Sequence, residues 1–311
     1  MNTQSNTMAE SFETQKTAPA TISATRTFYW SVRRELWENR SIYLAPLGVG
    51  GVFLFGFLLS LVRLPGKMRG LSALDPVQQH KSIVSHYELA GGLMMITTLL
   101  VAVFYCLDAL HGERRDRSIL FWKSLPVSDL ITVLAKASIP LFILPVITSV
   151  IGAALHLIML LLSSAVLLGS GMSAAALWTR LPWFQMSLLL LYHILTAHAL
   201  WPAPVYGWLL LVSGWARRAA VLWAVLPVVA IAGVEGIAFR TSHFAHMVGG
   251  RMIGVGAPSN AHTPDDIFPT NPMTHVTPGM FLGSPGMLIG FTVFAAFLAV
   301  AIRLRRYEGP I

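Results

Sequence analysis

Histidine and carboxylate side chains set within apolar runs are the residues of this chain whose types could carry chemistry. Glu235 and the two histidines His193 and His198 lie in such runs. An ionisable group inside a membrane is costly and is usually found on a pathway for protons, ions or substrates. His193 and His198 are five residues apart and do not share a helix face well, which favours packing or a hydrogen bond between helices. We therefore expect three possible pathway residues here and no metal site.

The sequence motifs of common enzymes are missing. The chain contains neither the H-E-x-x-H pair of zinc proteases nor the G-x-S-x-G of serine hydrolases, and Gly66-Lys67 is followed by Met68, so no phosphate-binding Walker A loop is present. Its sole cysteine, Cys106, excludes an intrachain disulfide and a cysteine metal cluster. We expect no catalytic residues, no cofactor bound by this chain and no ATP hydrolysis by the chain alone.

Residues 28–40 combine aromatic, apolar and charged side chains at helical spacing. Phe28, Val32 and Leu36 fall on one side of a helix and Arg34 on the opposite side. This pattern predicts an amphipathic helix in the membrane interface, although a plain extension of the first span is an alternative. The residues that define this helix are Phe28, Trp30, Arg33, Arg34 and Trp37.

A second informative segment, residues 113–126, begins with charges of both signs and continues into bulky apolar side chains before a Leu-Pro turn. Exposed aromatics beside arginines are typical of protein-docking surfaces. Alternatively, the aromatics dip into the membrane interface. The candidate residues are Glu113, Arg114, Arg115, Asp116, Arg117, Ile119, Phe121, Trp122, Lys123, Leu125 and Pro126.

These segments must be positioned by membrane spans, because 55% of the 311 residues are hydrophobic, only 12% are charged and the mean hydropathy is +0.64. A soluble globular chain carries about 25% charged residues, so a cytosolic enzyme, a disordered protein and a disulfide scaffold are excluded. About 20 apolar residues cross a bilayer core. Six stretches are long enough: 42–62, 89–107, 137–168, 183–212, 219–238 and 287–302.

Basic residues set the expected orientation. With the N-terminus inside, 15 Lys and Arg residues fall on the inner side and 7 on the outer side. Both termini are therefore expected in the cytoplasm, with the chain in the cell (inner) membrane. The net charge of +8 gathers at the edges of apolar runs, which indicates membrane lipids rather than nucleic acid as its partner.

The predicted fold class is an all-α integral membrane protein with six transmembrane helices. Its parts are a flexible cytoplasmic tail at 1–25, an amphipathic interfacial helix at 26–41 and a six-span domain at 42–311. A cytoplasmic loop is expected at 108–130 and an external loop at 239–286. Pro140 and Pro145 predict a kinked or tilted start to the third span. A rival topology breaks the fourth span at Pro202 and Pro204 into two re-entrant halves.

The run from Glu113 through Arg117 and Trp122 to Leu125-Pro126-Val-Ser resembles the segment after the second span in type-2 ATP-binding-cassette (ABC-2) exporter permeases. The stretch 203–218 and the closing 301–311 are also similar to bacterial members. The resemblance covers the chain from Phe28 to its end.

The resemblance implies a permease subunit of an ATP-driven exporter that forms a homodimer and pairs with a separate ABC ATPase, on which ATP and Mg²⁺ bind. Residues 113–126 would then be the coupling segment in the ATPase cleft, with Ile119, Phe121 and Trp122 as anchors, and residues 28–40 the connecting helix. A secondary transporter acting without an ATPase, or a non-transporting membrane anchor or sensor, is the alternative.

Overall fold

The computed structural model describes residues 23–71, 75–124, 127–254 and 278–307, and every regular element within these ranges is helical. The first half of the chain contains α1 (Ala24–Glu38), α2 (Ser41–Leu61), α3 (Leu64–Leu71), α4 (Pro76–Asp108), α5 (His111–Arg115), α6 (Ser118–Ser124), α7 (Asp129–Ser138), the π-helix η1 (Ile139–Ile143) and α8 (Leu144–Gly169). The second half contains α9 (Ala175–Arg180), α10 (Trp183–Leu195), the π-helix η2 (Thr196–Leu200), α11 (Ala203–Trp215), α12 (Ala220–Phe239), α13 (His243–Ile253), α14 (Pro278–Leu282) and α15 (Pro285–Tyr307).

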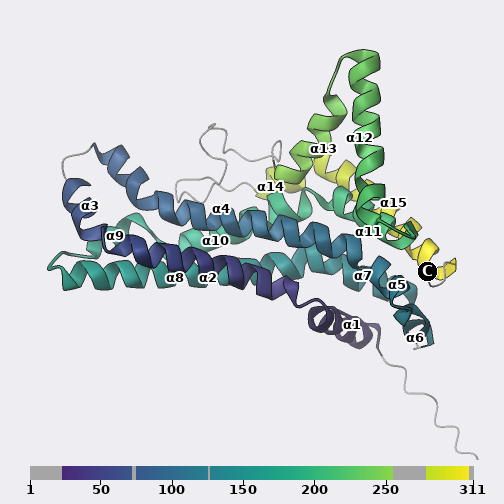
Figure 1. Ribbon diagram of the computed structural model, residues 1–311, viewed down its shortest axis with the longest axis horizontal. Coiled ribbons are helices and arrows are strands. Elements are labelled where there is room, and N and C mark those ends of the chain that lie inside the picture. The colour runs from purple at the N-terminus through teal and green to yellow at the C-terminus, as the bar shows by residue number, and fades with distance from the viewer. Residues whose placement is uncertain (1–22, 72–74, 125–126, 255–277, 308–311) are drawn as a thin grey trace, which may run out of the picture.

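Six helical segments in the described ranges are long and apolar enough to cross a membrane, as the sequence predicts. They are Ser41–Leu61, Lys81–Arg115, Asp129–Gly169, Leu177–Leu200, Ala220–Phe239 and Pro285–Tyr307. In the second of these, 61% of an apolar 18-residue window is buried within the molecule, and in the fifth only 11%. α4 is therefore the central helix of the bundle, whereas α12 is peripheral and stands away from it together with α13 (Figure 1).

The bundle has two ends with different helices. The terminal end carries α1, α5, α6, α7 and the last turns of α15, and the distal end carries α3, α9 and the start of α4 (Figure 1). Each end has its own core. Ile42, Tyr105 and Tyr206 belong to the core of the terminal half, and Met94 and Met159 to that of the distal half.

The third span is a single helical run of 41 residues, Asp129–Gly169. At 1.5 Å per residue it is about 60 Å long, twice the ~30 Å of a bilayer core. Proline cannot donate the helical hydrogen bond, and the helix widens at Pro140 into the π-helical turn η1. The irregularity expected at Pro140 is present, and α7 extends the span beyond it at the terminal end.

The fourth span crosses the molecule rather than turning back at its prolines. Arg180, just before α10, donates to Gln79 Oε1 at the start of α4 (2.9 Å), while Gly214 near the end of α11 accepts from Arg114 beyond the end of α4 (2.6 Å). The helix is interrupted at Trp201 and Pro202, after η2. The interruption is a kink, because the two sides of the proline pair lead to opposite ends of α4.

Candidate functional site

A cluster of charged side chains is buried at the terminal end of the bundle, and five elements contribute to it. We call the following residues the charge cluster: Arg34 and Glu35 of α1, Glu113 of α5, Asp129 and Lys136 of α7, and Arg305 of α15. Tyr105 near the end of α4 donates a hydrogen bond into it. The three carboxylates and three cations balance, which is the condition under which buried charges are tolerated.

Glu113 is the residue on which the cations converge. Its Oε1 lies 2.7 Å from Arg34 Nη2 and 3.1 Å from Lys136 Nζ. Its Oε2 accepts a short hydrogen bond from Arg305 Nη1. The side chain is 7% exposed, so these three partners replace water almost completely.

Glu35 provides the second centre of the cluster. Its Oε1 lies 2.7 Å from Arg34 Nη2 and 2.8 Å from Lys136 Nζ, and its Oε2 accepts from the Tyr105 hydroxyl at 2.8 Å. Burial acts to lower the pKa of the Arg34 guanidinium, but the carboxylates of Glu35, Glu113 and Glu38 outweigh it and raise that pKa above its ordinary value. Arg34 therefore stays charged, and α1 is fastened to α4, α5 and α7.

Helix ends supply two further members of the cluster. Ser128 caps α7 by accepting from the Ile131 amide (3.3 Å), and Asp129 occupies the first helical position, where a carboxylate favours the positive end of the helix dipole. Arg305 lies in the last turn of α15, where a cation is favoured, and its Nε is 3.2 Å from Asp129 Oδ1. The start of α7 is thereby joined to the end of α15.

The end of α11 holds α5 in place. Ser213 Oγ accepts from the backbone amides of Leu110 (3.0 Å) and His111 (2.8 Å), two donors that a helix start leaves without intrahelical partners. Arg114 is 4% exposed and donates to the Gly214 carbonyl. α5 is therefore connected to the fourth span as well as to the charge cluster.

α6 carries the aromatic residues predicted to dock a partner. Phe121 is 59% exposed and Leu120 is 58% exposed. Trp122 lies beneath them, with the Arg34 guanidinium carbon 3.9 Å from its ring centre and the Phe121 ring at 4.9 Å. We call Leu120, Phe121 and Trp122 the α6 face. Its outer residues are free to meet another molecule, while Trp122 connects it to α1.

Three residues expected on the docking surface are buried instead. Ile119 is 1% exposed and packs inside the chain, Glu113 is neutralised within the charge cluster, and Arg114 binds the Gly214 carbonyl. The expectation that Ile119, Glu113 and Arg114 lie on an exposed docking surface is wrong, because each side chain is already enclosed.

Of the remaining residues predicted for this surface, four are exposed and two lie outside the described ranges. Arg115, Asp116, Arg117 and Lys123 are exposed, and Arg117 has a left-handed backbone (φ 58°) that turns the chain between α5 and α6. Leu125 and Pro126 lie outside the described residues.

α1 has two distinct faces. Val32 and Leu36 pack against the core of the terminal half. On the exposed side, the Arg33 guanidinium carbon lies 5.0 Å from the centre of the Trp30 ring and 4.7 Å from that of Trp37. Phe28, at the start of the helix, is half-buried. Arg34 and Glu35 extend from this helix into the charge cluster.

The three possible pathway residues do not come together. Glu235 accepts from the Thr241 hydroxyl and from the backbone amides of His243 and Phe244, each at 2.8 Å, and so stabilises the start of α13. His193 is buried, with Nδ1 2.9 Å from the Leu189 carbonyl of its own helix.

His198 belongs to the π-helical turn η2, and its buried Nδ1 has no hydrogen-bond partner within the described ranges. In the part of the chain that the structure describes, no group of three His, Cys, Asp or Glu side chains could hold a metal ion.

Sequence reasoning missed three central residues of the cluster, Glu35, Lys136 and Arg305. Lys136 gave the clearest available signal, because it stands between two alanines at the edge of an apolar run. A lysine there requires a buried carboxylate partner. Sequence alone does not say which carboxylate, since neither partner is near Lys136 along the chain and Glu35 is 101 residues away.

No family model, no curated protein and no solved structure matches this chain.

Proposed function

We propose that this chain is the membrane-spanning permease subunit of an ATP-driven exporter of the ABC-2 type, and that a separate ABC ATPase docks on its α6 face. The observation that carries the proposal is the exposed pair Leu120 and Phe121 on a short helix that is fastened to α1 through Trp122 and Arg34. Exposed aromatics on a rigid support are typical of interface hot spots.

The charge cluster supports the same proposal, because it gives the α6 face a route to the spans. A displacement of α5 and α6 acts on α1, on α7 and on α15 through Glu113, and on α11 through Arg114 and Ser213. The salt bridges are buried and multiply hydrogen-bonded, so they resist separation more strongly than surface pairs. ATP binding and hydrolysis on the partner would in this way move α1 together with the third, fourth and sixth spans.

The proposed assembly contains two copies of this chain in the cell (inner) membrane, with the terminal end in the cytoplasm. The excess of basic residues on that side supports this orientation. Glu235 does not favour the alternative of a secondary transporter, because its carboxylate is engaged with the start of α13.

The test is a matched pair of substitutions, Phe121→Ala on the α6 face and Phe184→Ala at the start of α10. Phe184 is 73% exposed at the opposite end of the bundle. Removing an aromatic anchor from an interface costs about 2 kcal/mol, or roughly thirtyfold in affinity. We expect Phe121→Ala to lose the ATPase on purification from native membranes in mild detergent, and Phe184→Ala to retain it.

The outcome is read by mass spectrometry of the co-purified proteins and by ATP hydrolysis of the purified complex. If both variants retain the ATPase at the level of the unmodified chain, the α6 face is not the docking surface. If the unmodified chain brings down no nucleotide-binding subunit at all, the assignment as an ABC permease is wrong.

A further inference from the structure

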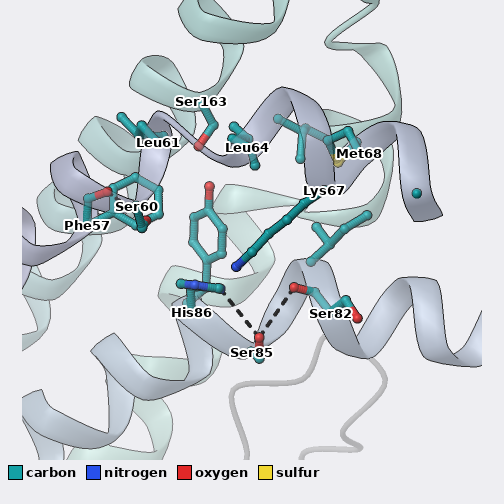
Figure 2. A pocket seen from close by; sticks show the side chains of 14 residues that line it. Phe57, Ser60, Leu61, Leu64, Lys67, Met68, Ser82, Ser85, His86 and Ser163 are labelled. Atoms are coloured by element: carbon teal, nitrogen blue, oxygen red, sulfur yellow. Dashed lines mark hydrogen bonds between the residues drawn. The ribbon is translucent and has the colours of Figure 1, made fainter.

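A cavity with several polar side chains in its wall lies at the distal end of the bundle, between the end of α2 and helices α3, α4, α8 and α9. Its volume is about 520 Å³. Lys67 of α3 extends across it toward His86 of α4, and Ser60, Ser82, Ser85 and Ser163 stand around it (Figure 2). The described residues that line the cavity include no carboxylate.

Two donors in this cavity, the Lys67 ammonium and the Tyr87 hydroxyl, are left available for a ligand. Lys67 makes no ion pair with any carboxylate in ranges 23–71, 75–124, 127–254 or 278–307. The Tyr87 side chain is 4% exposed, and its buried hydroxyl, beside Ser163, makes no hydrogen bond of ordinary geometry with a described residue. His86 meets Ser85 through Nδ1 (3.4 Å). A cation with neutral donors and no acid suits an anion that accepts several hydrogen bonds.

A second, apolar groove opens from the first cavity and runs between α2 and α4. It has a volume of about 860 Å³, and Phe57, Ser60 and His86 line both spaces. Its other end is at Leu44, 16 residues from Ser60 on the same helix, so it is about 24 Å long. Each leaflet contributes about half of a ~30 Å bilayer core, so this length accommodates a complete acyl chain.

Glycines keep the groove open. At Gly48 and Gly56, both of which line it, an added Cβ would meet nothing within 4 Å. The wall of α2 also includes Val52, which is 76% exposed. The groove is therefore an unfilled apolar channel along the surface of α2, joined at its distal end to the cavity that holds Lys67, His86 and Tyr87.

We propose that the cavity and the groove together bind one anionic phospholipid, with the phosphate at Lys67, His86 and Tyr87 and an acyl chain between α2 and α4. The combination of a cationic head pocket with a continuous apolar groove matches the two parts of such a lipid. The proposal goes beyond the function proposed above and does not depend on an ATPase partner. In the orientation proposed above, the lipid belongs to the outer leaflet.

The test uses the full chain, purified in mild detergent and titrated with phosphatidylglycerol or phosphatidylcholine of identical acyl chains. Native mass spectrometry gives the affinity for the first lipid bound. We expect phosphatidylglycerol to bind about fivefold more tightly, the ratio that one lysine provides near an anionic headgroup. Lys67→Gln should abolish this preference, whereas Lys81→Gln, an exposed lysine outside the cavity, should retain it.

The acyl-chain part is tested separately with Gly56→Leu, whose side chain would fill the groove, and Gly51→Leu, which also has open space but does not line it. Gly56→Leu should weaken the binding of both lipids, and Gly51→Leu should leave it unchanged. Equal binding of the two lipids by the unmodified chain overturns the proposal. So does a preference that survives Lys67→Gln, or a Gly56→Leu variant that binds like Gly51→Leu.

Discussion

At the scale of single residues, Glu113 and Glu38 show how differently two glutamates near the same arginine contribute. Glu113 is enclosed among Arg34, Lys136 and Arg305. Glu38 is 44% exposed and has one ion pair, 3.5 Å from Arg34 Nε. The difference matters because removing one partner of a buried ion pair leaves the others uncompensated, whereas an exposed pair is screened by water.

We therefore expect Glu113→Ala to destabilise the protein by roughly 3–5 kcal/mol, because it leaves three cations facing only Glu35 and Asp129. Glu38→Ala should cost less than about 1 kcal/mol. The measurement is the temperature at which the purified chain loses its folded state in mild detergent. Equal shifts in the two variants would show that the charge cluster does not hold the terminal end together.

At the scale of elements, α11 and α15 pack closely against each other at Gly207. A Cβ at this position would lie 2.8 Å from Phe294 Cδ2 and 3.3 Å from Phe297 Cβ. Without a water-driven hydrophobic force in the membrane, such small residues let helices pack closely. The fourth and sixth spans can thus approach each other closely because Gly207 has no side chain.

Gly207→Leu should separate these helices and destabilise the chain by roughly 1–3 kcal/mol, the usual cost of overpacking. Gly233→Leu on α12 is the control, because a Cβ there meets nothing within 4 Å. Thermal unfolding in detergent distinguishes them. A Gly207→Leu chain as stable as the control would mean that α15 moves freely relative to α11.

The sequence predicted the elements better than their contacts. Apolar length was sufficient to locate all six spans, and the π-helical turn at Pro140 follows from a missing amide donor. Phe121 and Ile119 were both predicted to be exposed on α6, but only Phe121 is exposed and Ile119 is buried. A seven-residue helix gives too little periodicity to define its inner face from the sequence. Glu35 was missed, because its partner Lys136 is distant along the chain.

At the scale of the whole molecule, the two ends of the bundle offer sites that test the proposed orientation. Tyr307 is 75% exposed at the end of α15, and Ser173 is exposed between α8 and α9 at the distal end. The native thiol of Cys106 is fully buried. A single new cysteine can therefore report on each end in a Cys106→Ala background.

With a membrane-impermeant thiol reagent on intact cells, we expect Ser173→Cys to be labelled and Tyr307→Cys to be labelled only after permeabilisation. The basis is the excess of lysine and arginine at the terminal end. The opposite pattern would reverse the topology. The α6 face would then lie outside the cell, where a cytoplasmic ATPase could not dock on it.

The π-helical turn η1 also determines which side chains of the helix that follows it face the bundle. A π-turn adds one residue to an otherwise α-helical run, so α8 is rotated by about 100° relative to where an unbroken continuation of α7 would place it. That rotation keeps Thr148, Ser149 and His156 buried in the bundle. Deleting one residue from η1 would restore an even helix and turn those polar side chains toward lipid. The number of residues in η1 is thus constrained, even though the identity of its apolar side chains is not.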